Sequence, residues 1–109
     1  MTSVLDKATA HWAGIRDGSI DVPEWGVTVH FVRPTLRDHA RYQKDIASDP
    51  AMAAVKLVQE RALDGKGGRL FDDELATFTS LRDAADPNVV SRIAQAILVT
   101  PPPGDAAKN

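Results

Sequence analysis

The residues whose types could support chemistry gather in segment 63–74, which reads Leu-Asp-Gly-Lys-Gly-Gly-Arg-Leu-Phe-Asp-Asp-Glu. An aspartate followed by glycines could belong to a calcium loop, and a Gly-Lys pair could belong to a phosphate-binding loop. The calcium motif fails, because counting from Asp64 places Lys66 and Gly68 where oxygen ligands are needed. The phosphate motif fails, because Gly67 follows the lysine where a serine or threonine is required. We therefore interpret the glycines as turn residues that can adopt positive φ.

The remaining candidates for catalysis or metal binding have simpler structural explanations. Asp72, Asp73 and Glu74 could form an acidic cluster, but negative charge is also favoured where a helix begins. No two histidines have the i, i+4 spacing of a helical metal site, and the three lie on separate predicted elements: His11, His30 and His39. No serine has the flanking glycines of a nucleophile elbow. We expect a protein that is not an enzyme and needs neither metal nor cofactor.

Composition is that of one small globular domain. The chain has 109 residues, of which 43% are hydrophobic and 26% charged, and its net charge is −2. Without cysteine it can form neither disulfides nor zinc–thiolate sites. The acidic balance disfavours nucleic-acid binding, and no apolar run approaches the roughly 18 residues of a membrane helix. No signal peptide is recognised, so we expect a cytoplasmic protein.

The first 33 residues predict a helix followed by a β-hairpin. Ser3 and Asp6 have the spacing of a capping box, so we expect a helix that begins at Ser3. Its apolar positions fall on one face: Leu5, Ala8, Trp12 and Ile15. Residues 19–33 alternate instead, with a turn at 24–26. The second strand would direct its apolar residues to one face of the sheet: Val27, Val29 and Phe31.

Two helices are predicted after Pro34. Thr35 is a suitable N-cap for the first, whose weak apolar face would comprise Leu36, His39 or Ala40, Gln43 and Ile46. Its outer face would be basic: Arg37, Arg41 and Lys44. Asp49 and Pro50 suit the N-cap and first position of the second helix, which would continue to Leu63. Its buried stripe would comprise Met52, Val55, Val58 or Gln59, and Ala62.

Two further helices, 73–83 and 87–99, are predicted to begin at Asp72 and at Asp86-Pro87. The first would carry Leu75, Phe78 and Leu81, and the second Val89, Val90, Ile93, Ala94 and Ile97. Before them, Leu70 and Phe71 would either cover the core or add a short piece of sheet.

The predicted elements amount to an α+β fold: about five helices packed with one small antiparallel β-hairpin or sheet, in a single domain. We expect this domain to span residues 1–100. Three consecutive prolines open the rest, so residues 101–109 are expected to form a disordered Pro-rich tail.

Residues 22–98 resemble the tail assembly chaperones of long-tailed bacteriophages and prophages. The matching pieces are Val-Pro-Glu-Trp-Gly before the strand Val-Thr-Val-His-Phe-Val-Arg, the helix 36–42, and the closing helix around Ile93 and Ile97. The most specific piece is the glycine segment, which is similar to the family pattern Asp-x-x-Gly-x-x-Leu-Phe-x-x-Asp/Glu. Two adjacent glycines at 67–68 replace an acidic or asparagine residue common there, and the N-terminal helix is not part of the resemblance.

The resemblance implies a small non-catalytic protein encoded between the tail tube and tape measure genes. Such proteins are thought to coat the apolar, helical tape measure protein and keep it soluble until tube subunits polymerise around it. They act in the host cytoplasm and are usually absent from the finished particle, and many also exist as a longer frameshifted form. The tape measure protein is the implied partner, the tail tube protein a second candidate, and homo-oligomerisation is left open; neither nucleic acid nor membrane is implied.

A tape measure helix would need an apolar groove or stripe. The candidate partner-binding residues are Trp25, Met52, Leu57, Leu70, Phe71, Ile93 and Ile97. Leu57 lies off the predicted stripe of its helix, so Leu57→Asp is expected to weaken partner binding with little loss of stability. Trp25, in a predicted turn, could anchor a partner or fold back over the core.

Two other functions remain open. One is a minor structural tail or head–tail joining protein of the same phage. The other is a small DNA-binding regulator, because helices 73–83 and 87–99 with their short turn could form a helix-turn-helix. The second helix offers few basic side chains near its start, which favours core packing of a helical hairpin.

Overall fold

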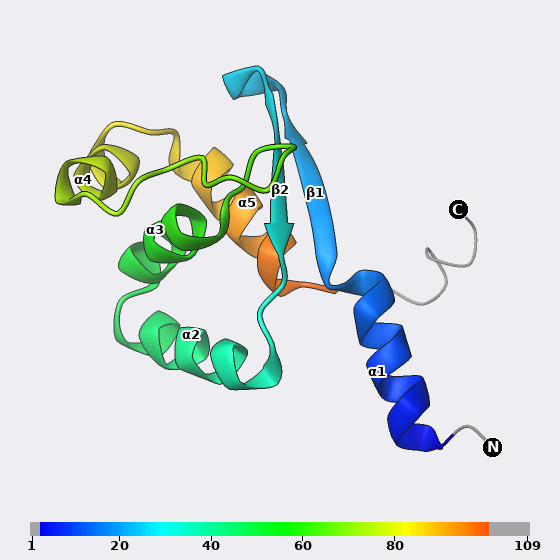
Figure 1. Cartoon of the computed structure of the whole chain (residues 1–109). Coiled ribbons are helices and arrows are strands. Elements are labelled where there is room, and N and C mark those ends of the chain that lie inside the picture. The colour runs from blue at the N-terminus through cyan, green and yellow to red at the C-terminus, as the bar shows by residue number, and fades with distance from the viewer. Residues whose placement is uncertain (1–2, 101–109) are drawn as a thin grey trace.

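The computed structural model describes residues 3–100, so the Pro-rich tail expected at 101–109 lies outside the described residues. In chain order the elements are α1 (Val4–Ile15), β1 (Asp17–Val22), a short 3₁₀ turn η1 (Pro23–Trp25), β2 (Val27–Val32), α2 (Leu36–Ser48), α3 (Pro50–Arg61), α4 (Leu75–Asp83) and α5 (Pro87–Leu98). Five α-helices and one two-stranded antiparallel sheet confirm the predicted α+β class for this part of the chain (Figure 1).

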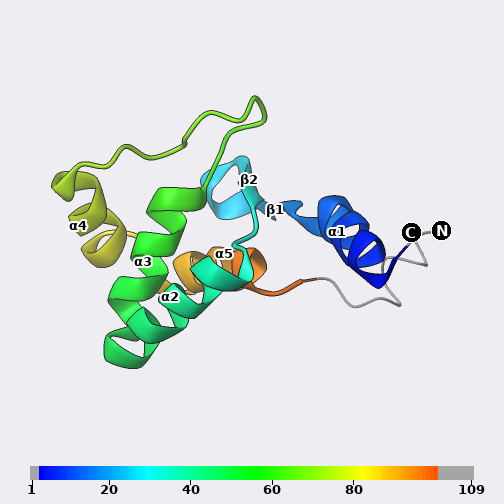
Figure 2. The ribbon, with the colours of Figure 1, turned by 60° about the horizontal axis from the view of Figure 1, so that its bottom comes forward.

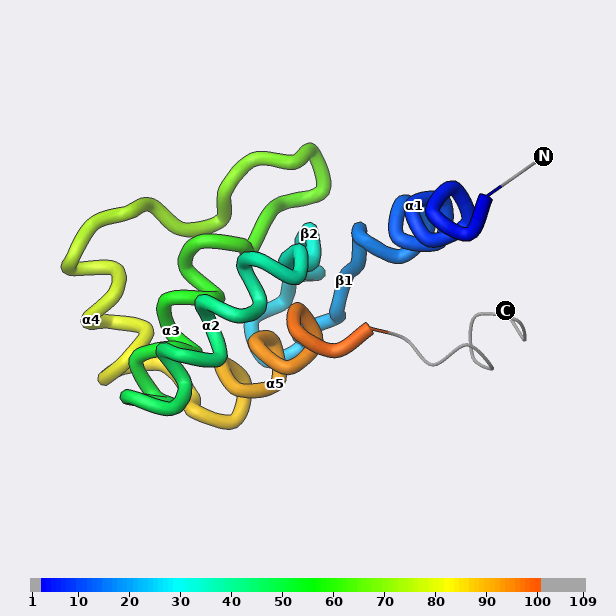
Figure 3. Tube along the Cα trace, turned by 90° about the horizontal axis from the view of Figure 1, so that it is seen from below, coloured from blue at the N-terminus to red at the C-terminus, as the bar shows by residue number. Residues whose placement is uncertain are grey.

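Helix α3 is the central element of the helical part. It packs against α2, α4 and α5, while α5 also packs against both strands of the hairpin. Helices α1 and α4 lie at opposite ends of the molecule (Figure 1 and Figure 2). Seen from below, α1 stands apart from the other helices (Figure 3). The core therefore lies between the hairpin and helices α2 to α5.

The hairpin forms where alternation predicts it. The register runs from Asp17 opposite Val32 to Val22 opposite Val27, and η1 closes the turn. Gly26 has φ of 67°, a left-handed conformation that glycine adopts without steric cost. The core-facing residues of the two strands are buried: Val22, Val29 and Phe31.

A third stretch of chain continues the sheet beside β2. The backbone N–H of His30 donates to the carbonyl of Leu63 over 2.9 Å, and that of Leu63 donates back over 2.7 Å. Leu63 also forms a bridge with Arg69. Leu70 and Phe71 do not join the sheet themselves; they pack against the core, which is the other role predicted for them. Helix α3 ends at Arg61, two residues earlier than predicted, because Leu63 is drawn into the pairing with His30.

Helix α2 buries a different face from the one predicted. Leu36 is 88% exposed and Ile46 37% exposed, whereas Tyr42 is the buried residue. The Tyr42 hydroxyl donates to Glu60 over 2.7 Å and accepts from Arg61 Nε at 3.3 Å. An aromatic ring buries a large apolar area, and its polar end is satisfied on α3, so Tyr42 rather than the weak aliphatic pattern orients α2.

The stripe predicted for α3 is too narrow. Met52 is 37% exposed, while the buried residues cover a wide arc: Ala53, Val55, Leu57, Val58 and Gln59. Leu57, interpreted as surplus to the core, is only 1% exposed. That interpretation is wrong, because α3 is covered by three helices and its buried face is wider than one amphipathic stripe.

Helix α4 begins later than predicted. Its N-cap is Glu74, and the Asp72 carboxylate instead accepts from the backbone N–H of Glu74 over 3.0 Å and from the Thr77 hydroxyl. Gln59 holds the segment that leads into α4. Its Nε2 donates to the carbonyl of Asp72 over 2.7 Å and to that of Glu74 over 3.2 Å. Leu75, expected to face inward, is 75% exposed.

The remaining helix starts and the face of α5 are confirmed. The side chains of Ser3, Thr35, Asp49 and Asp86 each accept a backbone N–H at the start of a helix. The buried residues of α5 are those predicted: Val89, Val90, Ile93, Ala94 and Ile97. Helices α4 and α5 each pack mainly on α3 rather than as the simple helical hairpin expected.

We expect Gln59→Leu to destabilise the fold by about 1–3 kcal/mol, because leucine cannot donate to the two carbonyls that Gln59 satisfies. Urea unfolding followed by circular dichroism measures the change. Gln43→Leu is the matched control on the exposed face of α2, and its effect should stay within about 0.5 kcal/mol. Equal effects of the two variants would contradict an anchoring role for Gln59.

Candidate functional site

Segment 63–74 is held together by its own hydrogen bonds. Asp64 Oδ1 accepts the backbone N–H of Lys66 over 2.7 Å and that of Gly68 over 2.9 Å. The hydrogen bonds from Gly68 and Lys66 hold the pKa of the Asp64 carboxyl below its usual value. Gly67 has φ of 85°, which meets the expectation of a glycine turn with positive φ. The Asp64 carboxylate is therefore committed to the turn.

The acidic residues that follow have similar local roles. Hydrogen bonds from the Thr77 hydroxyl and the Glu74 backbone lower the pKa of the Asp72 carboxyl. Asp73 forms an ion pair with Arg69 over 2.6 Å. Among residues 3–100, no cluster of three or more His, Cys, Asp or Glu side chains could hold a metal ion. In the same part of the chain, no helix combines the length and apolar character that a membrane crossing requires.

Trp25 and Phe71 meet at the tip of the hairpin. Their rings form an edge-to-face pair with centroids 6.3 Å apart and planes at 83°. Both side chains are partly buried against the core, as is Leu70. Next to Trp25, the Glu24 carboxylate pairs with Arg92 of α5 over 2.6 Å and fixes the tip to that helix. Trp25 thus packs over the core, one of the two roles predicted for it.

The other predicted partner-binding residues do not form one surface. Ile93 and Ile97 are 0% exposed and Leu57 is 1% exposed, so all three are core residues and none is an exposed surface residue. Met52 is accessible, but it lies on α3 beside Lys56 and Phe78, in a separate hollow from Trp25 and Phe71. The structure therefore brings together only the aromatic pair and Leu70.

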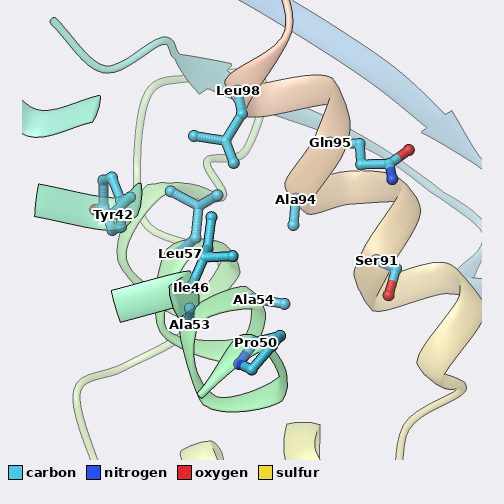
Figure 4. A pocket seen from close by; sticks show the side chains of 10 residues that line it. All are labelled: Tyr42, Ile46, Pro50, Ala53, Ala54, Leu57, Ser91, Ala94, Gln95 and Leu98. Carbon is cyan, nitrogen blue, oxygen red and sulfur yellow. The ribbon is translucent and has the colours of Figure 1, made fainter. Parts of the chain in front are cut away.

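A more suitable binding site is an apolar cleft between α2, α3 and α5, called here the α2–α3–α5 cleft (Figure 4). Its volume is about 170 Å³. The side chains that line it are Tyr42, Ile46, Pro50, Ala53, Ala54, Leu57, Ser91, Ala94, Gln95 and Leu98. A cavity near 150 Å³ holds a molecule of benzene size, so this cleft matches one large apolar side chain.

The shape of the cleft follows from the sizes of its residues. Ala54 on α3 points toward α5, which carries Ala94, while Ala53 lies beside Ile46 of α2; these short side chains leave space in the cleft. Leu57 lies at the floor and Ile46 at the mouth. Ser91 and Gln95 supply polar groups on one side only. The cleft is thus an apolar hollow with a partly polar rim.

The cleft is not predicted by the apolar patterns of the individual helices. Leu57 is predicted to be exposed and is buried, and Ala94 is predicted only as part of the buried face of the last helix. The sequence analysis assigns no binding role to Tyr42, Ala53 or Ala54. The one feature of the sequence that hints at the cleft is a pair of alanines, Ala53 and Ala94, at buried positions of two different helices. That signal becomes meaningful only when α3 and α5 are known to be neighbours.

Comparison with solved structures gives a likeness that covers most of the chain. No protein-family model matches the chain, and no curated protein matches it. The chain is similar to a solved structure described as that of the bacteriophage HK97 tail assembly chaperone, with a TM-score of 0.52 and 21% sequence identity. The match covers 89% of this chain and 99% of that one. At this identity the likeness shows a shared, distant fold that agrees with the resemblance seen in the sequence.

The structure reverses the expectation for Leu57→Asp. We now expect this variant to lose at least about 4 kcal/mol of stability, because it removes a buried leucine and places a carboxylate without a partner in the core. Thermal unfolding measures the loss, and Leu75→Asp on the exposed face of α4 is the matched control. Retained stability in Leu57→Asp would restore the original interpretation of Leu57 as a surface residue.

Proposed function

We propose that this protein is a tail assembly chaperone of a long-tailed phage or prophage, which binds the tape measure protein and keeps it soluble during tail tube assembly. The observation that carries the proposal is the fold shared with the HK97 tail assembly chaperone over nearly the whole of both chains. The glycine segment that resembles the family pattern supports it independently at the level of sequence.

The α2–α3–α5 cleft offers a place for such a partner. An amphipathic helix that lies in a groove is held by apolar side chains that project at intervals of three or four residues. The cleft is open at Ile46, which is 37% exposed, and its volume suits one such side chain. We infer that one apolar side chain of a tape measure helix enters there while the helix lies across α2 and α5.

The role proposed is one of protein binding rather than catalysis, in the host cytoplasm and not in the mature virion. Asp64 and Asp72, the acidic side chains of the glycine segment with lowered pKa, accept hydrogen bonds from their own turns. A DNA-binding role for α5 is disfavoured, because Arg92, its basic side chain, is paired with Glu24. These observations leave binding through an apolar surface as the best supported activity.

Co-expression with the tape measure protein encoded by the same phage tests the proposal. We expect the tape measure protein to be soluble when this chain is present and to precipitate when it is absent. Ile46→Glu, which places a carboxylate at the mouth of the cleft, should weaken the interaction about tenfold, a loss of about 1.4 kcal/mol. Leu75→Glu is the matched control, since Leu75 is an exposed helical leucine outside the cleft.

The two measurements test the chaperone function and the binding site separately. A tape measure protein that precipitates equally with and without the chain would contradict the chaperone function. Normal solubility with Ile46→Glu would retain the function and reject the cleft as the binding site. Mass spectrometry of purified virions addresses the structural alternative, because a minor tail or head–tail joining protein would be found in them at a fixed copy number.

A further inference from the structure

An apolar groove, called here the α1 groove, lies between α1 and the body of the protein. Its volume is about 670 Å³. The side chains that form its walls come from α1, from α2 and from the end of the described chain: Ala8, Trp12, Leu36, His39, Leu98 and Thr100. Leu36 is 88% exposed, and no side chain of α1 is buried. The groove therefore leaves apolar surface of both helices open to solvent within the described residues.

The described chain ends at the wall of this groove. Thr100 is the last residue described, and it lines the groove. The carbonyl of Val99 accepts from Arg33 Nε at 3.4 Å, and Arg33 Nη1 donates to the carbonyl of Ile15 over 2.6 Å. The chain after α5 is thus fixed beside the C-terminal end of α1 (Figure 1). Because consecutive Cα atoms are about 3.8 Å apart, residue 101 starts at the groove.

The residues that follow have the composition of a groove ligand. Residues 101–103 are three prolines. Consecutive prolines favour a polyproline II helix, which is extended before it binds and has no internal hydrogen bonds. Such segments dock in grooves lined by aromatic side chains. Trp12 supplies an aromatic wall here, and the rest of the described chain covers its side chain only in part.

The length of the proline run matches the distance along α1. A polyproline II helix rises about 3.1 Å per residue, so three prolines extend about 9 Å. Along α1, the rise from Ile15 back to Ala8 is about 10 Å. A run that enters beside Ile15 and follows the groove therefore passes Trp12 and reaches Ala8. The short side chain of Ala8 leaves room there for a proline ring.

The polar groups of the groove also suit prolines. A proline has no backbone N–H, so a docked run buries no donor that lacks a partner. Its carbonyls are free to accept, and the side chains of Trp12 and His39 bring N–H donors to the groove. Residues 1–2 lie outside the described residues too, but they precede α1 at its far end.

Tethering favours this segment over an occupant from another molecule. A segment joined to its site by a short linker has an effective concentration in the millimolar range. We propose that residues 101–103 dock in the α1 groove as a polyproline II segment that packs on Trp12. The docked segment covers the exposed side of α1 and closes the groove to other apolar segments.

Fluorescence of Trp12 in the full chain tests the proposal. Trp12 and Trp25 are the two tryptophans, so Trp25→Phe leaves Trp12 as the sole reporter and keeps a ring beside Phe71. In that background we replace all three prolines of residues 101–103 by serine. We expect the emission to shift to longer wavelength and acrylamide quenching to increase about twofold, because the docked prolines cover one side of the indole.

The matched control carries three serine substitutions farther along the same tail: Asp105→Ser, Ala106→Ser and Ala107→Ser. It should keep the emission and quenching of the parent chain. Unchanged emission in the proline variant, or equal shifts in both variants, would overturn the proposal. An emission that depends on protein concentration equally in all variants would overturn it as well, and would assign the groove to a second copy.

A disulfide cross-link tests the same contact without relying on tryptophan. The chain has no cysteine, so two introduced cysteines react with each other in a dilute monomer. Pro103→Cys combined with Ala8→Cys should form an intramolecular disulfide under mild oxidation, detected by mass spectrometry. Pro103→Cys combined with Ala10→Cys is the control and should form little, because Ala10 lies about 200° around α1 from Ala8.

Equal disulfide yields from the two pairs would contradict docking in the groove. Both experiments use the purified chain without a partner. Their outcome is therefore independent of the chaperone function, which is tested by solubility of the tape measure protein.

Discussion

Helix α3 buries a wide arc of its surface, and the other helices are arranged around that requirement. Leu57 and Val58 are at most 1% exposed although they are adjacent in sequence and point to different sides of the helix. Such a helix needs cover on several sides, which α2, α4 and α5 supply. Gln59 lies among these apolar side chains and holds the chain before α4 by hydrogen bonds to two carbonyls. The central helix thus positions the rest of the helical layer.

The α2–α3–α5 cleft is a consequence of how α3 is covered. Short side chains line the cleft on both helices, Ala53 and Ala54 on α3 and Ala94 on α5, and they leave space beside Tyr42 and Leu57. A closed core would place a larger side chain there, because protein interiors pack densely. An apolar hollow that opens at the surface costs some stability, and a partner's side chain that fills it recovers that free energy.

Helix α1, in contrast to α3, has no buried residue. It has sound local signals, with Ser3 and Asp6 in a capping box, but no tertiary contact that buries its apolar stripe. Arg33 fixes its direction without covering its side. The molecule therefore has two kinds of apolar surface, a small cleft within the body and a long stripe outside it. The volume of the cleft matches one large apolar side chain.

Local signals in the sequence determined where most helices begin and how the hairpin pairs. Side-chain oxygens of Thr35, Asp49 and Asp86 cap helices wherever they were expected to, because capping depends only on residues within one turn. The spacing of apolar residues likewise determined the buried face of α5, which has a single apolar side. Only the tertiary structure decided that Tyr42 and Leu57 are buried and that the cleft lies between them, because both depend on which helices become neighbours. The sequence predicts both the N-cap of α1 and the apolar face of this helix. Only the tertiary structure shows that no other element buries that face.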